Sequence, residues 1–283
     1  QVAILLSKNG FVKRMLIEVF RSQNRGGRGV SGMTTREEDI IDQLIVTNTH
    51  DFVLCFTSRG RVFKIKAYQI PESSRQGKGL SIAHLLQLDE DEILTTMVPV
   101  STFDTEEYLL MATKLGVIKK TAVKAFIHFK NRAIIAINLD EKDQLRWVKK
   151  TNGQKDVVML TTAGMVIRFH EDQARPLGRA SRGVRGIKIK PEDQLVAMNT
   201  ISPEETKLYL MLITQYGYGK NMRVDEFRPQ NRGGIGVKGV AFRKSIPDDC
   251  VQDSVITTRS NEVVIVTKAG VLCRQEVKNI STQ

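Results

Sequence analysis

The stretch TKLGVIKK at residues 113–120 is one of six related copies in this chain. The others are SKNGFVKR (7–14), TSRGRVFK (57–64), TTAGMVIR (161–168), TQYGYGKN (214–221) and TKAGVLCR (267–274). Successive glycines, from Gly10 to Gly270, lie 48 to 56 residues apart. A fixed period of this length indicates an array of one supersecondary unit. Because every copy carries a cation soon after its glycine, the repeat also predicts a belt of positive charge.

Each copy is expected to form the turn of a β-hairpin, because apolar and β-branched residues lie on both sides of a glycine. The predicted strand pairs are Val2–Leu6 with Phe11–Met15, Phe52–Thr57 with Arg61–Ile65, Tyr108–Ala112 with Val117–Lys120, Val157–Thr161 with Met165–Phe169, Tyr209–Ile213 with Tyr218–Val224, and Glu262–Val266 with Val271–Glu276.

Two further features recur between the hairpins. A loop rich in glycine, lysine and arginine leads into a short strand, such as Gly186–Ile189. An acidic turn, expected to be solvated, then enters another apolar strand. The examples are Glu37–Asp42 before Leu44–Val46, Asp89–Glu92 before Ile93–Val98, and Asp140–Asp143 before Leu145–Val148. One helical turn is expected at Ile82–Leu88.

Each unit therefore holds about four strands and little helix, which is typical of a propeller blade. We predict an all-β, six-bladed, propeller-like fold with four-stranded blades, forming a single domain over residues 1–283. The blades are expected at about residues 1–50, 51–106, 107–154, 155–205, 206–260 and 261–283. The last blade is expected to be incomplete, because only 13 residues follow Gly270.

Composition narrows the function classes. The chain has 43 Lys and Arg against 31 Asp and Glu, a formal net charge of +12. This excess predicts attraction to polyanions, although a solubilising surface would explain the charge equally well. The isolated cysteines Cys55, Cys250 and Cys273 indicate no disulfide framework or zinc motif and favour a reducing cytosol. No apolar run of ~18 residues occurs, and no membrane segment or signal peptide is predicted.

No catalytic chemistry is predicted in this chain. The four histidines are scattered, and the five tyrosines lie in or beside the predicted strands. No P-loop motif occurs, so no nucleotide site is expected. Because the histidines and cysteines form no cluster, no metal site is expected either.

Loops that combine glycine with cations follow the hairpins. Gln23–Gly29 reads QNRGGRG, and related loops occur at Arg75–Gly79, Arg182–Gly186 and Gln230–Lys238. Closely spaced glycines let a partner approach the main chain, and arginine forks suit phosphate oxygens. A lone loop of this kind is most simply a solvated connection. Its recurrence at one position in successive units favours phosphate binding.

These motifs resemble the C-terminal domain of the DNA gyrase A protein. Gln23–Gly29 is similar to the seven-residue box of that family, QRRGGKG. The phrase SRGVRGI at Ser181–Ile187 and the run Val46–Asp51 leading into Leu54–Phe56 are similar as well. The resemblance covers essentially the whole chain. It implies a six-bladed β-pinwheel, a propeller relative whose blades exchange strands, with duplex DNA bent around its basic rim.

The resemblance also implies which residues bind DNA. In the box these are Gln23, Asn24, Arg25, Gly26, Gly27, Arg28 and Gly29, with Arg28 replacing a lysine and Asn24 departing from the usual arginine. The cations expected on the rim are Lys13, Arg14, Lys64, Lys78, Lys119, Lys120, Arg168, Arg182, Arg185, Lys220, Arg232, Lys238 and Arg274. Gln230–Gly236 is a near-copy of the box with Ile235 in the cationic slot. It is either a second clamp or, more simply, a blade loop of similar shape.

The implied partners are duplex DNA, the rest of the gyrase A protein and the gyrase B protein, which is the ATPase, in the cytoplasm. ATP and Mg²⁺ would be bound elsewhere in that enzyme, and the isolated domain is expected to be monomeric. Three alternatives remain open. They are the C-terminal domain of topoisomerase IV, in which the box is typically degraded; a protein-interaction propeller with an apolar patch on one face; and an independent enzyme, which lacks a convergent catalytic set.

Overall fold

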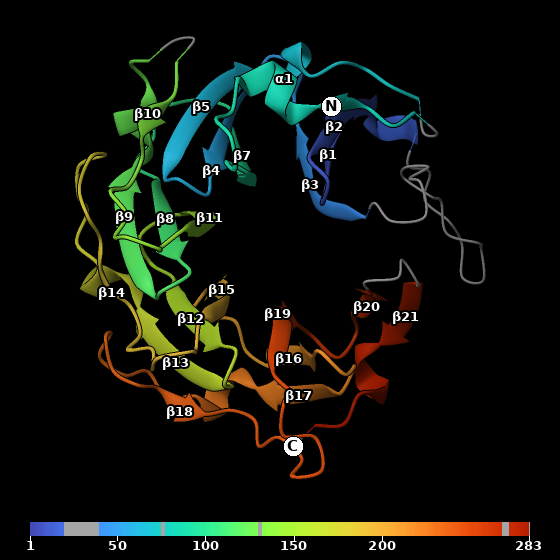
Figure 1. Cartoon of the computed structure of the whole chain (residues 1–283), viewed down its shortest axis with the longest axis vertical. Helices are drawn as coiled ribbons and strands as arrows, with labels where there is room; N and C mark the ends of the chain where they lie inside the picture. The colour runs from blue at the N-terminus through green and yellow to red at the C-terminus, as the bar shows by residue number, and fades with distance from the viewer. Residues whose placement is uncertain (20–39, 75–76, 130–131, 268–271, 283) are drawn as a thin grey trace. The chain divides into compact units, whose positions relative to one another are not determined.

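The repeats fold into small antiparallel sheets that follow one another along the chain (Figure 1). The computed structural model describes residues 1–19, 40–74, 77–129, 132–267 and 272–282. The hairpin strands are β1 (Val2–Ser7) with β2 (Phe11–Leu16), β4 (Phe52–Thr57) with β5 (Arg61–Lys66), β8 (Tyr108–Thr113) with β9 (Val117–Ala122), β12 (Asp156–Thr161) with β13 (Met165–His170), β16 (Tyr209–Thr214) with β17 (Gly219–Arg223), and β20 (Glu262–Val266) with β21 (Leu272–Glu276). The predicted hairpins are therefore confirmed.

A third strand from the same repeat pairs with the first strand of each of the first five hairpins. These strands are β3 (Ile41–Thr47), β7 (Leu94–Val100), β11 (Leu145–Thr151), β15 (Leu195–Ile201) and β19 (Val251–Thr257). Each ends opposite the residue where its hairpin begins, as in the pairs Val2 with Thr47 and Tyr209 with Thr257. The constant register shows that the sequence period is also a structural period.

The fourth strand of a sheet comes from the following repeat. The strands β6 (Leu80–Ser81), β10 (Ile134–Ile135), β14 (Val184–Arg185) and β18 (Val237–Lys238) pair with β2, β5, β9 and β13 respectively. Each therefore crosses to the hairpin of the preceding repeat, which agrees with the strand exchange expected of a β-pinwheel. The short strand in the fourth repeat is Val184–Arg185, so the predicted span Gly186–Ile189 was placed two residues too late.

The turn of each described hairpin explains why the repeat contains glycine. Gly10, Gly60, Gly116, Gly164 and Gly217 have φ between 72° and 82°, a region that side chains disfavour. Their N–H groups donate to the carbonyl of a Ser or Thr three residues earlier, at 2.9–3.0 Å. The Thr113 hydroxyl also accepts from the N–H of Val117 at 3.1 Å. The recurring Ser or Thr is thus a turn residue that the sequence analysis did not single out.

The acidic turns are bound to these hairpin turns. The carboxylate of Asp143 accepts from the N–H of Leu115 at 2.9 Å, and that of Asp193 accepts from the N–H of Ala163 at 3.0 Å. Glu92 accepts from Nε of Arg61 at 2.9 Å. Glu92 and Asp143 are buried, so the expectation of solvated turns was wrong for them. The reason is that each carboxylate accepts hydrogen bonds from its hairpin, Asp143 from a turn N–H group and Glu92 from the Arg61 guanidinium.

Helical structure in the described ranges is limited to single turns. The predicted turn at Ile82–Leu88 is confirmed as α1 (Ile82–Leu86). A 3₁₀ turn follows the second strand of every hairpin: η1 (Ile17–Val19), η2 (Ala67–Gln69), η3 (Val123–Phe126), η4 (Glu171–Gln173), η5 (Val224–Glu226) and η6 (Val277–Asn279).

The chain forms two compact units. One comprises Gln1–Thr105, Phe126–Ala136 and Val266–Leu272, and the other comprises Glu106–Ala125, Ile137–Ile265 and Cys273–Gln283. The segment Phe126–Ala136 belongs to the first unit because it carries β10, which pairs with β5. The predicted single domain and its blade boundaries stay predictions.

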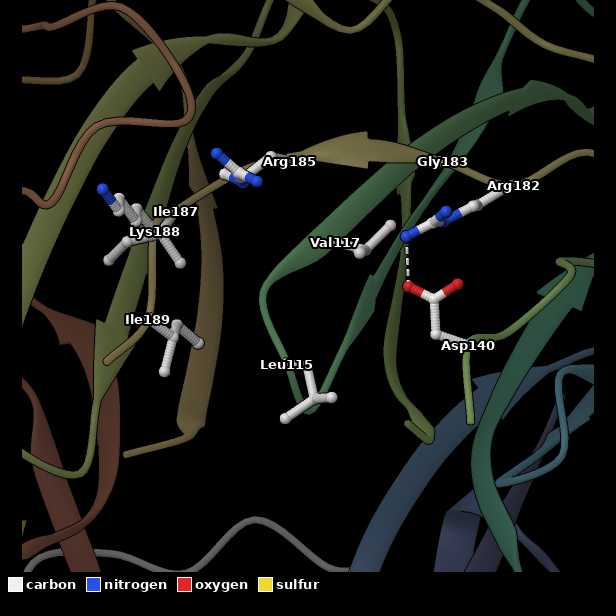
Figure 2. A pocket seen from close by; sticks show the side chains of 9 residues that line it. All are labelled: Leu115, Val117, Asp140, Arg182, Gly183, Arg185, Ile187, Lys188 and Ile189. Atoms are coloured by element: carbon white, nitrogen blue, oxygen red, sulfur yellow. Dashed lines mark hydrogen bonds and ion pairs between the residues drawn. The ribbon is translucent and has the colours of Figure 1, made fainter. Parts of the chain in front are cut away.

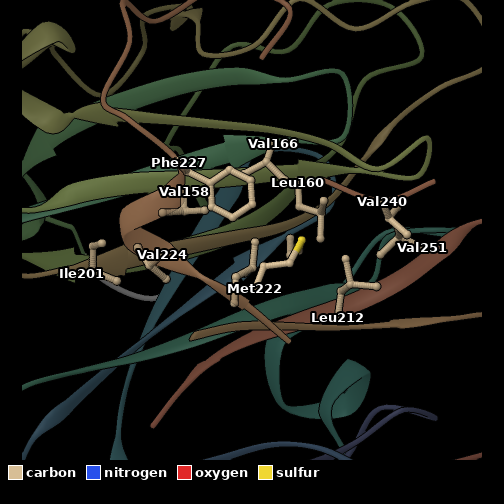
Figure 3. Close-up of a cluster of buried hydrophobic side chains, with 12 residues drawn as sticks. Val158, Leu160, Val166, Ile201, Leu212, Met222, Val224, Phe227, Val240 and Val251 are labelled. Atoms are coloured by element: carbon tan, nitrogen blue, oxygen red, sulfur yellow. The ribbon is translucent and has the colours of Figure 1, made fainter. Parts of the chain in front are cut away.

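Neighbouring sheets within a unit pack through their apolar faces. Figure 3 shows such a core in the second unit, where Val158 and Leu160 of β12 meet Leu212 of β16 and Met222 of β17. Phe227, which follows η5, closes the same cluster. The first hairpin strand is buried along its whole length in β1 and β12, and this explains the continuous apolar sequence of these strands.

Truncating one of these core side chains should destabilise the protein. We expect Leu160→Ala to lower the free energy of unfolding by about 2–5 kcal/mol, because Leu160 is fully buried and its loss leaves a cavity. Leu115→Ala, at a leucine 42% exposed in the same unit, is the matched control and should change it by less than about 0.5 kcal/mol. Urea unfolding of both variants checks this, and equal losses would contradict the packing described.

Candidate nucleic-acid interface

The cation shared by the repeats binds protein main chain. Four residues after the turn glycine stand Arg14, Lys64, Lys120 and Arg168. Each donates to a carbonyl at or beside the 3₁₀ turn of the next repeat: Arg14 Nε to Ile70 (3.1 Å), Lys64 Nζ to Ile127 (2.6 Å), Lys120 Nζ to Glu171 (2.8 Å) and Arg168 Nη1 to Val224 (3.2 Å). In the fifth repeat Asn221 takes this position, and its Nδ2 donates to Val277 at 3.0 Å. These side chains link consecutive repeats.

Carboxylates and rings complete these links. Arg168 also pairs with Asp156 at 2.7 Å, and Lys120 lies 3.7 Å from the buried carboxylate of Glu171. The Lys64 ammonium stands 4.7 Å from the centre of the Phe129 ring. Lys120 is buried, and the side chains of Arg14 and Arg168 are largely covered. The expectation that Arg14, Lys120 and Arg168 form an exposed rim was therefore wrong, and Lys64 is half-buried.

The cations one position earlier are used in a similar way. Lys13 Nζ donates to the carbonyls of Ser74 (3.1 Å) and Gly77 (2.9 Å), and Lys220 Nζ donates to that of Gly239 (2.9 Å). Lys119 Nζ donates to the carbonyl of Arg179. Lys13 and Lys119 are 0% exposed, so their predicted place on the rim was also wrong.

Burial changes the proton affinity of these lysines. Loss of water contact lowers the pKa of Lys13. For Lys119, burial and then the nearby positive charge of Arg179 lower the pKa to about 8. Both lysines serve as donors to loop carbonyls and have no surface to offer a ligand.

Five cations of the predicted set are exposed, and four of them lie on or beside the exchanged strands. They are Lys78, Arg182, Arg185, Lys238 and Arg274. Arg182 pairs with Asp140 and Arg274 with Glu262, and the Lys78 ammonium lies 3.9 Å from the centre of the Phe11 ring. Arg185 and Lys238 carry no ion pair among the described residues. Phosphate groups could reach these five side chains without unfolding the sheets.

Two of these loops are joined in the second unit. Arg232 Nη1 donates to the carbonyl of Arg185 at 3.1 Å, and the N–H of Lys188 donates to the carbonyl of Gly234 at 2.8 Å. Arg232 Nε donates to the carbonyl of Gln173 at 2.8 Å. The guanidinium of Arg232 therefore holds the two loops together, which favours the interpretation of Gln230–Gly236 as a blade loop.

A groove opens beside the first of these loops, entirely within the second unit (Figure 2). Its volume is about 520 Å³. The hairpin turn supplies Leu115 and Val117, and the residues around β14 supply Arg182, Arg185, Ile187, Lys188 and Ile189. Lys188 was missed by the sequence analysis. The alternation IKIK at 187–190 was the available signal, since Ile187 is buried whereas Lys188 and Lys190 are exposed.

The box lies outside the described residues. Gln23, Asn24, Arg25, Gly26, Gly27, Arg28 and Gly29 all fall in the range 20–39, and Arg75 and Gln76 fall in a second such range. Within the described part of the chain, no group of three or more His, Cys, Asp or Glu side chains could hold a metal ion. No helix in those ranges is long and apolar enough to cross a membrane.

Strand-exchanged four-stranded sheets with cationic loops at their outer strands define a β-propeller-like domain of the pinwheel type. The chain belongs to the family described as the DNA gyrase C-terminal domain, β-propeller, whose model matches residues 2–48, 51–101, 107–152, 155–202 and 208–258. The five matched segments coincide with the first five repeats, and a sixth blade has no match there.

Relatives and solved structures agree with this assignment. The DNA gyrase A protein of Staphylococcus epidermidis is 40% identical over 282 residues, covering 99% of this chain and 31% of that protein. The Staphylococcus aureus protein is also 40% identical, covering 99% and 32%. A solved DNA gyrase A C-terminal domain is 25% identical with a TM-score of 0.77, covering 100% of this chain and 91% of that one. The C-terminal domain of DNA topoisomerase IV has a TM-score of 0.85 at 24% identity, covering 100% and 85%. The chain thus spans about a third of the length of its curated relatives.

The pKa of Lys119 gives a testable pH dependence. Its folded pKa is about 8 and its ordinary value is 10.5, so between these values the unfolded chain binds more protons and stability rises with pH. We expect the Lys119→Met variant to lack this pH-dependent contribution to the free energy of unfolding. The unfolding free energy of the parent should gain about 1 kcal/mol relative to the variant between pH 7 and pH 9. Urea unfolding at both pH values checks this; a constant difference would contradict the burial of a titrating ammonium.

Proposed function

We propose that this chain is the DNA-wrapping domain of a DNA gyrase. The observation that carries the proposal is the recurrence of exposed cations on glycine-containing loops beside the exchanged strands, in a chain of the gyrase C-terminal domain family. Such loops offer guanidinium and ammonium groups to phosphates, and no helix long enough to read a DNA groove lies among the described residues. Binding would therefore depend little on sequence.

The proposed contacts are the exposed cations Lys78, Arg182, Arg185, Lys188, Lys238 and Arg274, together with the box Gln23–Gly29. The buried and main-chain-bound cations take no part. About eight phosphate contacts would give a salt slope near −7 on logarithmic axes. Bending 20–30 bp by 40–90° costs about 1–6 kcal/mol, so several contacts must act together along the duplex.

The wrapped duplex would be presented to the cleavage core of the enzyme with one handedness, so that ATP-driven strand passage introduces negative supercoils. In this proposal the domain is a six-bladed β-pinwheel without a catalytic site. The rest of the gyrase A protein and the gyrase B protein, which is the ATPase, are its partners in the cytoplasm, and ATP and Mg²⁺ bind elsewhere in the enzyme. The isolated domain is a monomer.

The C-terminal domain of topoisomerase IV is the second candidate, favoured by the TM-score of 0.85 with that structure. The 40% identity to the gyrase A protein and the preserved glycines of the box support gyrase instead. Joined to the rest of the gyrase A protein and combined with the gyrase B protein, the chain should support ATP-dependent negative supercoiling of relaxed plasmid. Relaxation without supercoiling would favour topoisomerase IV.

Removing exposed cations should weaken DNA binding through its ionic component. We expect Arg185→Ala combined with Lys238→Ala to reduce the salt slope by about 2, because each side chain would contact one phosphate. Fluorescence anisotropy with a 40 bp duplex at several salt concentrations measures it. Lys207→Ala is the control, since Lys207 lies just before β16, at the opposite end of its sheet from the hairpin turn. An unchanged slope in the double variant would refute contacts at these loops.

The box should act on bending more than on binding. We expect Arg25→Ala combined with Arg28→Ala to leave the folded state intact and to lower end-to-end FRET on a short duplex, with a smaller loss of affinity. Neutralising two closely spaced guanidinium groups removes the attraction that holds a bent duplex. Equal FRET in variant and parent at saturation would defeat the role of the box.

A further inference from the structure

The groove beside β14 has a floor that DNA binding does not explain. Leu115 is 42% exposed at the turn, and the half-buried Val117 and Ile189 add apolar surface around it (Figure 2). A volume of about 520 Å³ falls in the range of ligand pockets, roughly 300–1,000 Å³. The phosphate groups that the cations attract gain nothing from contact with an apolar surface.

The residues that form this floor differ between the second and third repeats. In the second repeat the residues flanking the turn glycine are Arg59 and Arg61, which pair with Asp89 at 3.3 and 2.9 Å. In the third repeat the same positions hold Leu115 and Val117, and the side chain of Asp143 instead accepts a turn N–H. The apolar surface is therefore not a requirement of the hairpin fold.

The rim of the groove is cationic and already holds one carboxylate. Arg182 pairs with Asp140, as the dashed line in Figure 2 marks. Arg185 and Lys188 are exposed, and among the residues that the structure describes neither forms an ion pair. Arginine binds carboxylates through two parallel hydrogen bonds, so this rim is suited to acidic side chains.

We propose that the groove binds an acidic peptide segment of another protein, one that carries a large apolar side chain between carboxylates. The apolar side chain would lie against Leu115, Val117 and Ile189, and the carboxylates would pair with Arg185 and Lys188. This inference goes beyond the proposed function. Because Arg185 is also a proposed phosphate contact, a bound peptide would compete with DNA at this loop.

The experiment uses the 283-residue chain and two fluorescein-labelled peptides of equal charge, DEDLFEDE and DEDGGEDE. Anisotropy titration should show the first binding at least about tenfold more tightly than the second. Leu115→Ser should weaken the first peptide by about five- to tenfold, because it removes apolar contact area at an exposed site. Val117→Thr, which keeps side-chain shape, is a second variant, and Leu44→Ser is the control at a leucine 49% exposed in the other unit.

The same variants are titrated with a 40 bp duplex, whose affinity should not change in Leu115→Ser. The proposal is overturned if neither peptide binds, if both bind equally, or if Leu115→Ser and Val117→Thr bind the first peptide like the parent. It is also overturned if Leu115→Ser weakens the duplex instead, since the groove would then be part of a DNA surface. The peptide titrations contain no DNA, so their result is independent of the DNA-wrapping proposal.

Discussion

Backbone carbonyls near the 3₁₀ turns need hydrogen-bond donors, and the rest of the structure depends on which residues supply these donors. A buried carbonyl left without a partner costs about 1–3 kcal/mol. The preceding repeat supplies the donor through a long polar side chain: Arg14, Lys64, Lys120, Arg168 or Asn221. Asn221 shows that the requirement is for an N–H donor and not for positive charge. These bonds join each repeat to the next one along the chain.

This constraint changes the meaning of the charge pattern. A cation that recurs with the period of the fold is more readily explained by the fold than by a ligand, because every repeat presents the same carbonyls. The cations of the predicted set that stay exposed lie beside or on β6, β14, β18 and β21. The formal charge of +12 therefore overstates the charge that a polyanion can contact.

Repeats with the same backbone fold can still differ in sequence at positions that the fold does not constrain. The residues flanking the turn glycine are ion-paired arginines in the second repeat and apolar in the third. Substitution there leaves the turn intact, because glycine and the preceding Ser or Thr form it. Distinct binding surfaces can arise at such positions without loss of the sheet beneath them.

The sequence by itself determined the period, the hairpins, α1 and the family, because turn glycines and continuous apolar strands are local signals. It also located the loops that carry Arg182, Arg185 and Lys238. Only the tertiary structure decided which cations are available, since the fate of Lys13, Lys119 and Arg168 depends on carbonyls about 60 residues away in the chain. A local pattern shows that a lysine is present, but long-range packing decides whether it meets water or a buried carbonyl.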